Sequence, residues 1–177
     1  AEVVRAGGSA FAAGAATLTV AKLAADLSNS GTALAKVTGM DLLCGVGTWA
    51  FKYLIRHQAG LTTTGVRFSV NHSGTVTSFQ NVTRLVYLSS TAASAAQDQD
   101  ALLATGSVVA AFASRVKRTT TGGTTISADA ANADMLTIIE GLAIVTASGN
   151  LELWHGSEVA AATTVMAGSS LILTKIA

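Results

Sequence analysis

The sequence has little of what several protein classes require. Of its 177 residues none is proline, one is cysteine, 5% are aromatic and 12% are charged, and the formal net charge is +1. Half of the residues are hydrophobic. This excludes a disordered chain, because such a chain needs the polar bias or the self-repulsion that keeps segments unfolded. The length fits one compact domain.

Long hydrophobic runs are also lacking. A membrane-spanning helix needs about 20 consecutive apolar residues. No window without charge exceeds 16 residues, and those at residues 6–21 and 159–174 are interrupted by Gly, Ser and Thr. No basic segment followed by an apolar core marks a secretory signal, and Ala1 fits removal of an initiator methionine. We therefore expect no membrane partner and synthesis in the cytoplasm.

The single cysteine, Cys44, excludes an internal disulfide framework and a cysteine-based zinc site. Its apolar neighbours Leu42, Leu43 and Val46 predict that it is a small buried residue. A net charge near zero removes the long-range attraction that nucleic-acid binders use, so we expect no nucleic-acid partner. Much apolar surface with few charges is typical of a subunit that is covered in an assembly.

Residues able to carry catalysis or bind metal are present but not in a recognisable pattern. No serine lies in a nucleophile-elbow motif, so the Ser, His and Asp residues are interpreted as scattered surface polar groups. The histidines His57, His72 and His155 lie in three separate segments without an adjacent carboxylate. Asp98 and Asp100 lack the 12-residue spacing and terminal Glu of a calcium loop. We therefore expect no enzyme activity, no cofactor and no metal.

Residues 1–17 predict a short N-terminal arm. They are rich in Gly and Ala and have no sustained periodicity, and each glycine would cost about 1 kcal/mol in a helix interior. The arm is either ordered by a partner or a frayed terminus.

From residue 18 onward the pattern changes to short strands separated by Gly, Ser, Asn and Thr. The clearest is residues 47–57, which places on one face the side chains of Trp49, Phe51, Tyr53 and Ile55 and on the other those of Thr48, Lys52 and Arg56. Val66, Phe68 and Val70 alternate in the same way. The turn at residues 71–74 then predicts a hairpin with a strand over residues 75–88.

The remaining segments complete the fold prediction. Residues 89–104 predict a loop or one short helix, residues 106–116 a strand, and residues 117–133 a loop rich in Thr, Gly and Ala. The whole pattern over residues 18–177 predicts an all-β domain, an antiparallel β-sandwich or jelly roll of eight to ten strands without βαβ units.

Residues 135–146 are apolar on both faces, which is expected only inside a sandwich or at a subunit interface. Glu140 interrupts this strand. A buried carboxylate needs a cation or hydrogen-bond donors from this subunit or a neighbour, whereas an exposed position at one end of the barrel needs neither. The candidate oligomer-interface residues are Leu136, Ile138, Ile139, Glu140, Leu142 and Ile144.

Residues 45–76 and 135–176 carry a resemblance to a known family. The first segment resembles the strand, Thr-rich loop and strand of bacteriophage virion proteins that end in a jelly-roll domain. The second is similar to their C-terminal hairpin and closing strand and, more distantly, to the end of the tumour-necrosis-factor and complement globular heads. The resemblance covers about residues 18–177.

The resemblance implies a trimer of ten-stranded jelly rolls about a threefold axis, without a catalytic role. Such trimers serve as decoration (cement) proteins on phage capsids, and the short chain with its short arm favours that role. The expected partners are two further copies and the major capsid protein or another virion protein, on the capsid surface. Val3, Val4, Arg5 and Phe11 of the arm are candidate capsid contacts.

The alternative function is a fibre or tail tip that binds a host receptor or glycan. It predicts contact through the loops at residues 60–65, 89–106 and 117–133. Trp154 and Tyr87 are the candidate stacking residues there, although such residues more often belong to a core.

Overall fold

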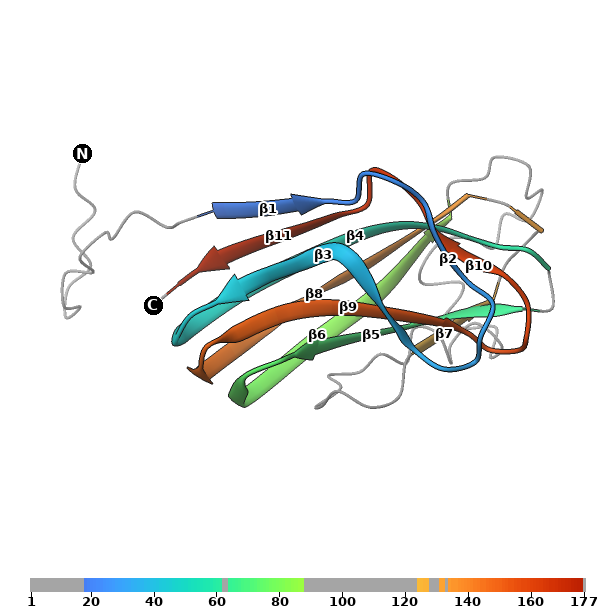
Figure 1. Cartoon of the computed structure of the whole chain (residues 1–177). Coiled ribbons are helices and arrows are strands. Elements are labelled where there is room, and N and C mark those ends of the chain that lie inside the picture. Colours follow the sequence, from blue (N-terminus) through green and yellow to red (C-terminus); the bar gives the residue numbers. More distant parts are fainter. Residues whose placement is uncertain (1–17, 62–63, 88–123, 128–130, 133, 177) are drawn as a thin grey trace, which may run out of the picture.

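The computed structural model describes residues 18–61, 64–87, 124–127, 131–132 and 134–176 (Figure 1). All regular structure in this part of the chain is β, which confirms the predicted all-β sandwich. The strands are β1 (Leu18–Lys22), β2 (Leu27–Asn29), β3 (Ala35–Cys44), β4 (Gly47–Ala59), β5 (Gly65–His72), β6 (Thr75–Tyr87), β7 (Thr124–Ser127), β8 (Met135–Ala147), β9 (Gly149–Ser157), β10 (Thr163–Val165) and β11 (Ser170–Lys175). These eleven strands exceed the expected eight to ten because β2 and β10 have only three residues each.

The strands form two antiparallel sheets, seen as two layers in Figure 1. In sheet A the strands run in the order β1, β11, β4, β8, β6. The short β10 pairs with the last residues of β4, and β2 pairs with β10. Sheet B has the order β3, β9, β5, β7. From β2 to β10 successive strands alternate between sheet A and sheet B. This alternation is the wrapping of a jelly roll.

The predicted hairpin at residues 71–74 is wrong. The turn itself is present, but β5 pairs with β9 and β7 while β6 pairs with β8, so the turn carries the chain from sheet B to sheet A. It packs against the β8–β9 turn, where a side chain on Gly74 or Gly149 would run into the opposite backbone. Turn residues specify a reversal of direction, and the pairing partners are chosen by the rest of the sandwich.

Several sequence expectations fall on residues outside the described part. These are the arm with Val3, Val4, Arg5 and Phe11, the loop or helix at residues 89–104 and the strand at residues 106–116. The expected loop at residues 117–133 contains strand β7, which pairs with β5. Its four residues, TTIS, are too few to show a period in the sequence.

The core lies between the two sheets, and β4 supplies much of it. Trp49, Phe51, Tyr53 and Ile55 are buried as predicted. The ring of Phe51 stacks on Phe79 of β6 with 5.4 Å between ring centroids. The predicted core residues of β5 are likewise buried, and so is Cys44.

Candidate functional site

The candidate site is the outer face of sheet A, meaning the side chains of β1, β11, β4 and β8 that point away from sheet B. Because residues paired across antiparallel strands share a face, the register sets which side chains are neighbours. Two rows of neighbouring side chains cross the centre of this face from β1 to β8. One row is Val20, Ile172, Lys52 and Glu140, and the other is Leu18, Thr174, Ala50 and Leu142.

Large apolar side chains are exposed on this face. The relative exposures are 63% for Leu18, 55% for Val20, 46% for Leu142 and 43% for Ile144. Ile172 is half-buried among them. Several large apolar side chains exposed on one face point to an interaction site, whereas single exposed apolar residues do not.

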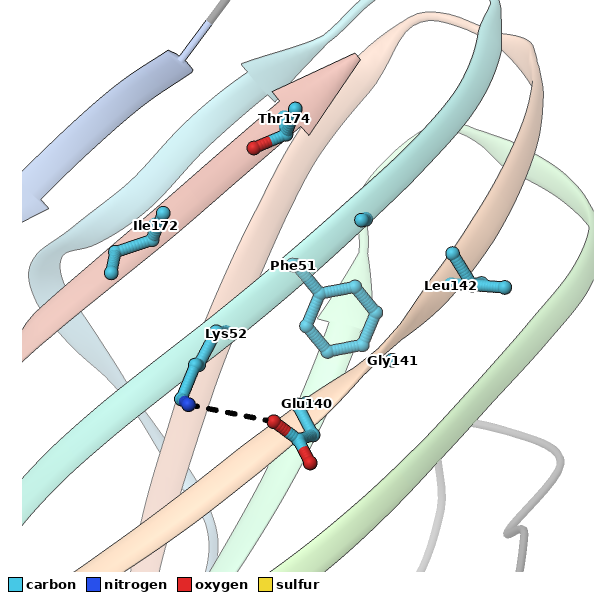
Figure 2. A pocket seen from close by; sticks show the side chains of 8 residues that line it. Phe51, Lys52, Glu140, Gly141, Leu142, Ile172 and Thr174 are labelled. Atoms are coloured by element: carbon cyan, nitrogen blue, oxygen red, sulfur yellow. Dashed lines mark ion pairs between the residues drawn. The ribbon is translucent and has the colours of Figure 1, made fainter. Parts of the chain in front are cut away.

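A hollow of about 350 Å³ lies near the centre of the face (Figure 2). Its lining includes Ala50, whose side chain is small, and Gly141, which has none, and the larger Leu142 and Ile172 stand around it. The Phe51 ring forms part of its floor: a Cβ built on Gly141 would lie 2.7 Å from Phe51 Cζ. The hollow is open and mostly apolar, which suits an apolar side chain of a partner.

Two ion pairs lie on this face, Arg56–Asp134 at 3.1 Å and, near its centre, Lys52–Glu140. Lys52 Nζ lies 3.6 Å from Glu140 Oε2, and the side chains keep 44% and 32% of their exposure (Figure 2). Glu140 therefore lies in the middle of β8 with a cation from its own subunit. A partner covering this face would remove both charges from water, which costs free energy and costs least while they stay paired.

Five of the six predicted interface residues lie on the outer face of sheet A, and Ile139 does not. Leu136, Ile138, Glu140, Leu142 and Ile144 alternate outward along β8. Ile139 is 2% exposed and packs in the core, because odd-numbered positions of this strand point toward sheet B. Including it as an interface residue was wrong.

Sequence reasoning missed the contributions of β1 and β11 to this face. Leu18 and Val20 alternate with polar or small residues, so β1 carries a period-two signal. Ile172 lies between two buried leucines in an apolar run, so β11 carries no such signal. What the sequence did not show was that these two strands lie beside β4 in register.

The outer face of sheet B is polar by contrast. Lys36 Nζ lies 3.0 Å from both Asp41 Oδ2 and Glu152 Oε1, and Trp154 Nε1 donates a hydrogen bond of 3.1 Å to Glu152 Oε2. The hydrogen bonds to Glu152 and then Asp41 raise the pKa of Lys36. Trp154 is half-buried on β9, and Tyr87 ends β6, so both stacking candidates lie on strands and not in the expected loops.

The histidines are not scattered surface groups as expected. His57, His72 and His155 are 0%, 6% and 3% exposed. His57 and His155 both point into the core, from β4 and β9 respectively. Within the described ranges, no group of three or more His, Cys, Asp or Glu residues is placed to hold a metal ion.

The part of the chain covered by the structure contains no helix long and apolar enough to cross a membrane. Comparison with protein-family models finds no match, and a search of curated proteins finds none either.

Proposed function

We propose that this protein is a non-enzymatic structural protein of a virion, a capsid decoration protein that stabilises the phage head by bridging capsid subunits. In this proposal it assembles as a homotrimer through the outer face of sheet A. The observation that carries the proposal is the exposed apolar surface that spans four strands of that sheet. The resemblance of residues 45–76 and 135–176 to phage jelly-roll proteins supports the virion role.

The energy of association follows from the same residues. Full burial of one exposed Leu, Ile or Val stabilises by about 1.5–3 kcal/mol. Association costs about 4–15 kcal/mol in lost translational and rotational freedom, so one such side chain is not enough. The combined burial of four such side chains supplies a free energy of the size required, provided that one partner covers all of them. These side chains are Leu18, Val20, Leu142 and Ile144.

The shape of the face supports a specific partner. A specific interface buries about 800 Å² per partner and is packed as densely as a protein interior. The hollow over Ala50 and Gly141 offers a place where an apolar side chain of a neighbouring copy would fit. The Lys52–Glu140 pair would restrict the orientations in which two copies meet, because a misplaced partner would leave a charge unpaired.

Native mass spectrometry and analytical ultracentrifugation test the homotrimer. The wild-type protein is expected to be trimeric at micromolar concentration, and Leu142→Ser is expected to shift the equilibrium toward monomer. Leu43→Ser is the matched control, because Leu43 is 67% exposed but lies on β3 of sheet B. A monomeric wild type, or equal loss of trimer in both variants, would reject this interface.

The cement role is tested on particles. Virions lacking the protein are expected to open at a lower temperature, and adding purified protein should restore their resistance. Equal resistance with and without the protein would reject this role. Imaging that places the protein on a fibre or tail tip would favour the alternative, in which a glycan array and host adsorption assays become the deciding measurements.

A further inference from the structure

A group of buried polar side chains lies at one end of the core, away from the outer face of sheet A. Its centre is formed by His57 of β4 and His155 of β9, which are 0% and 3% exposed. His57 Nε2 lies 2.8 Å from Thr137 Oγ1 of β8. The His57 ring also meets the ring of Phe68 of β5 edge-on, with 5.1 Å between centroids.

Several polar atoms of this group have no hydrogen-bond partner. They are Nδ1 of His57, Nδ1 of His155, Oγ1 of Thr64 and Oγ of Ser157. A buried polar atom without a partner costs about 1–3 kcal/mol. The unpaired polar atoms therefore make this end of the core less stable, and burial of apolar side chains in the rest of the sandwich must offset their cost.

The surroundings hold both rings neutral. Burial and, to a smaller extent, the nearness of His155 lower the pKa of His57 to about 3. Burial also lowers the pKa of His155 to about 4. A proton placed on either ring would be a buried charge facing the other ring.

No described carboxylate faces these rings to stabilise a proton. Neighbouring β8, β5 and β10 present Thr137, Phe68, Thr163 and Val165, none of which is charged. On β4, the next residue Arg56 points outward and lies 3.1 Å from Asp134 Oδ2. On the side of β3, Lys36 is held on the outer face of sheet B by Glu152 and Asp41. Glu158 is exposed and accepts a hydrogen bond from Gly65 N.

We propose that His57 and His155 form an acid-sensitive latch that keeps this end of the sandwich closed at neutral pH and releases it as the pH falls. The connections from β4 to β5 and from β9 to β10 meet here. They are joined by the hydrogen bond from Gly60 N to Ala162 O, at 2.9 Å, and the adjoining bond from Ser157 N to Gly31 O, at 3.0 Å. Release of the latch breaks these bonds while the centre of the sheets stays paired.

The direction of the pH effect follows from the protons bound in each state. In the open state each imidazole regains its ordinary pKa of about 6.5. Above that pH neither state is protonated, so the closed state keeps its full stability. Below that pH, the open state binds protons that the closed state does not. The equilibrium constant for opening therefore rises about tenfold per pH unit for each histidine, until the pH approaches the pKa of the closed state.

Two measurements on the wild-type protein test the latch. Ring NMR signals of His57 and His155 are expected to stay in the neutral form above pH 5 while the protein is folded. Hydrogen exchange, corrected for intrinsic rates, is expected to accelerate from pH 7 to pH 5 at the amides of Gly60 and Ser157 and to stay much faster there than at Phe51 or Leu173, because a local opening costs less free energy than global unfolding. Titration of both rings near pH 6.5, or exchange at Gly60 and Ser157 as slow as at Phe51 and Leu173, would overturn the proposal.

Variants assign the effect to the histidine pair. In His57→Gln/His155→Gln the opening at Gly60 and Ser157 is expected to lose most of its pH dependence, whereas His72→Gln is expected to keep it. His72 is the matched control because it is a buried histidine at the other end of β5, where Nδ1 accepts the Gly74 N–H at 3.1 Å. A double variant that opens with acid as the wild type does would overturn the proposal, and if it does not fold, the wild-type measurements decide.

Discussion

At the scale of single residues, Gly141 shows how closely two strands can approach. A Cβ at this position would run into the carbonyl oxygen of Gln80 on β6 and would lie 2.7 Å from Phe51 Cζ. The backbone oxygen cannot turn aside as a flexible side chain would. The absence of a side chain at Gly141 thus allows both the β6–β8 pairing and the close approach of the Phe51 ring.

We expect Gly141→Ala to lower the free energy of unfolding by about 1–3 kcal/mol, the usual cost of overpacking. Urea denaturation measures this change. Gly45→Ala is the control, because a Cβ there meets nothing within 4 Å, and its stability should change by less than about 1 kcal/mol. Equal stability of the two variants would contradict this account of Gly141.

Cys44 was predicted to be buried, and the structure confirms it. Burial raises the pKa of the thiol to about 11, so the reactive thiolate is scarce at neutral pH. We expect Ellman's reagent at pH 8 to leave folded protein unlabelled and to label one thiol per chain in urea. Rapid labelling without denaturant would show that Cys44 is accessible in the native protein.

At the scale of elements, β8 has two apolar faces with different roles. Ile139 fills the core at 2% exposure, whereas Leu142 is 46% exposed on the outer face of sheet A. The sequence showed that both faces are apolar. It did not show which face the second sheet covers, because this depends on where the other strands pack.

The two faces of β8 are expected to respond differently to truncation. Ile139→Ala should lower the free energy of unfolding by about 2–5 kcal/mol, since it leaves a cavity in the core. Leu142→Ala should change the stability of the monomer by less than about 1 kcal/mol and weaken self-association instead. Denaturation at a protein concentration where both variants are monomeric separates the effects, and similar losses of stability would refute the assignment of faces.

The Lys52–Glu140 pair allows a test of whether the outer face of sheet A becomes buried in the assembly. Removing one partner of a buried ion pair is strongly destabilising, while replacing both with apolar residues is often neutral or favourable. We therefore expect Glu140→Leu to weaken the oligomer by tenfold or more and Lys52→Met/Glu140→Leu to restore it. Sedimentation equilibrium measures both, and if Glu140→Leu has no effect, this pair stays in water.

At the scale of the whole molecule, the outer faces of the two sheets differ in chemistry. The face of sheet B holds Lys36, Asp41 and Glu152 in a connected network. The face of sheet A carries two separate ion pairs, Lys52–Glu140 and Arg56–Asp134, and also exposes the large apolar side chains of Leu18, Val20, Leu142 and Ile144. An assembly that covers sheet A and leaves sheet B in water would bury these apolar side chains.

Acid should destabilise the whole fold through the core histidines. Relative to pH 7.5, we expect the free energy of unfolding at pH 5 to fall by about 2 kcal/mol for each of His57 and His155, because only the unfolded chain binds those protons. Guanidinium denaturation across this pH range measures the loss. In the variant His57→Gln/His155→Gln the free energy of unfolding should change little over this pH range. If the variant loses as much stability as the wild type, other groups cause the loss.

The sequence by itself determined the fold class and the inward and outward positions along strands such as β4 and β5. This was possible because period-two alternation is a local property of a strand. Only the tertiary structure decided the register, which places Val20 and Ile172 beside the Lys52–Glu140 pair. It also decided that the turn at residues 71–74 changes sheets and that His57 meets His155. These pairings join residues far apart in the chain, so they depend on how the two sheets close over one core and not on any local pattern.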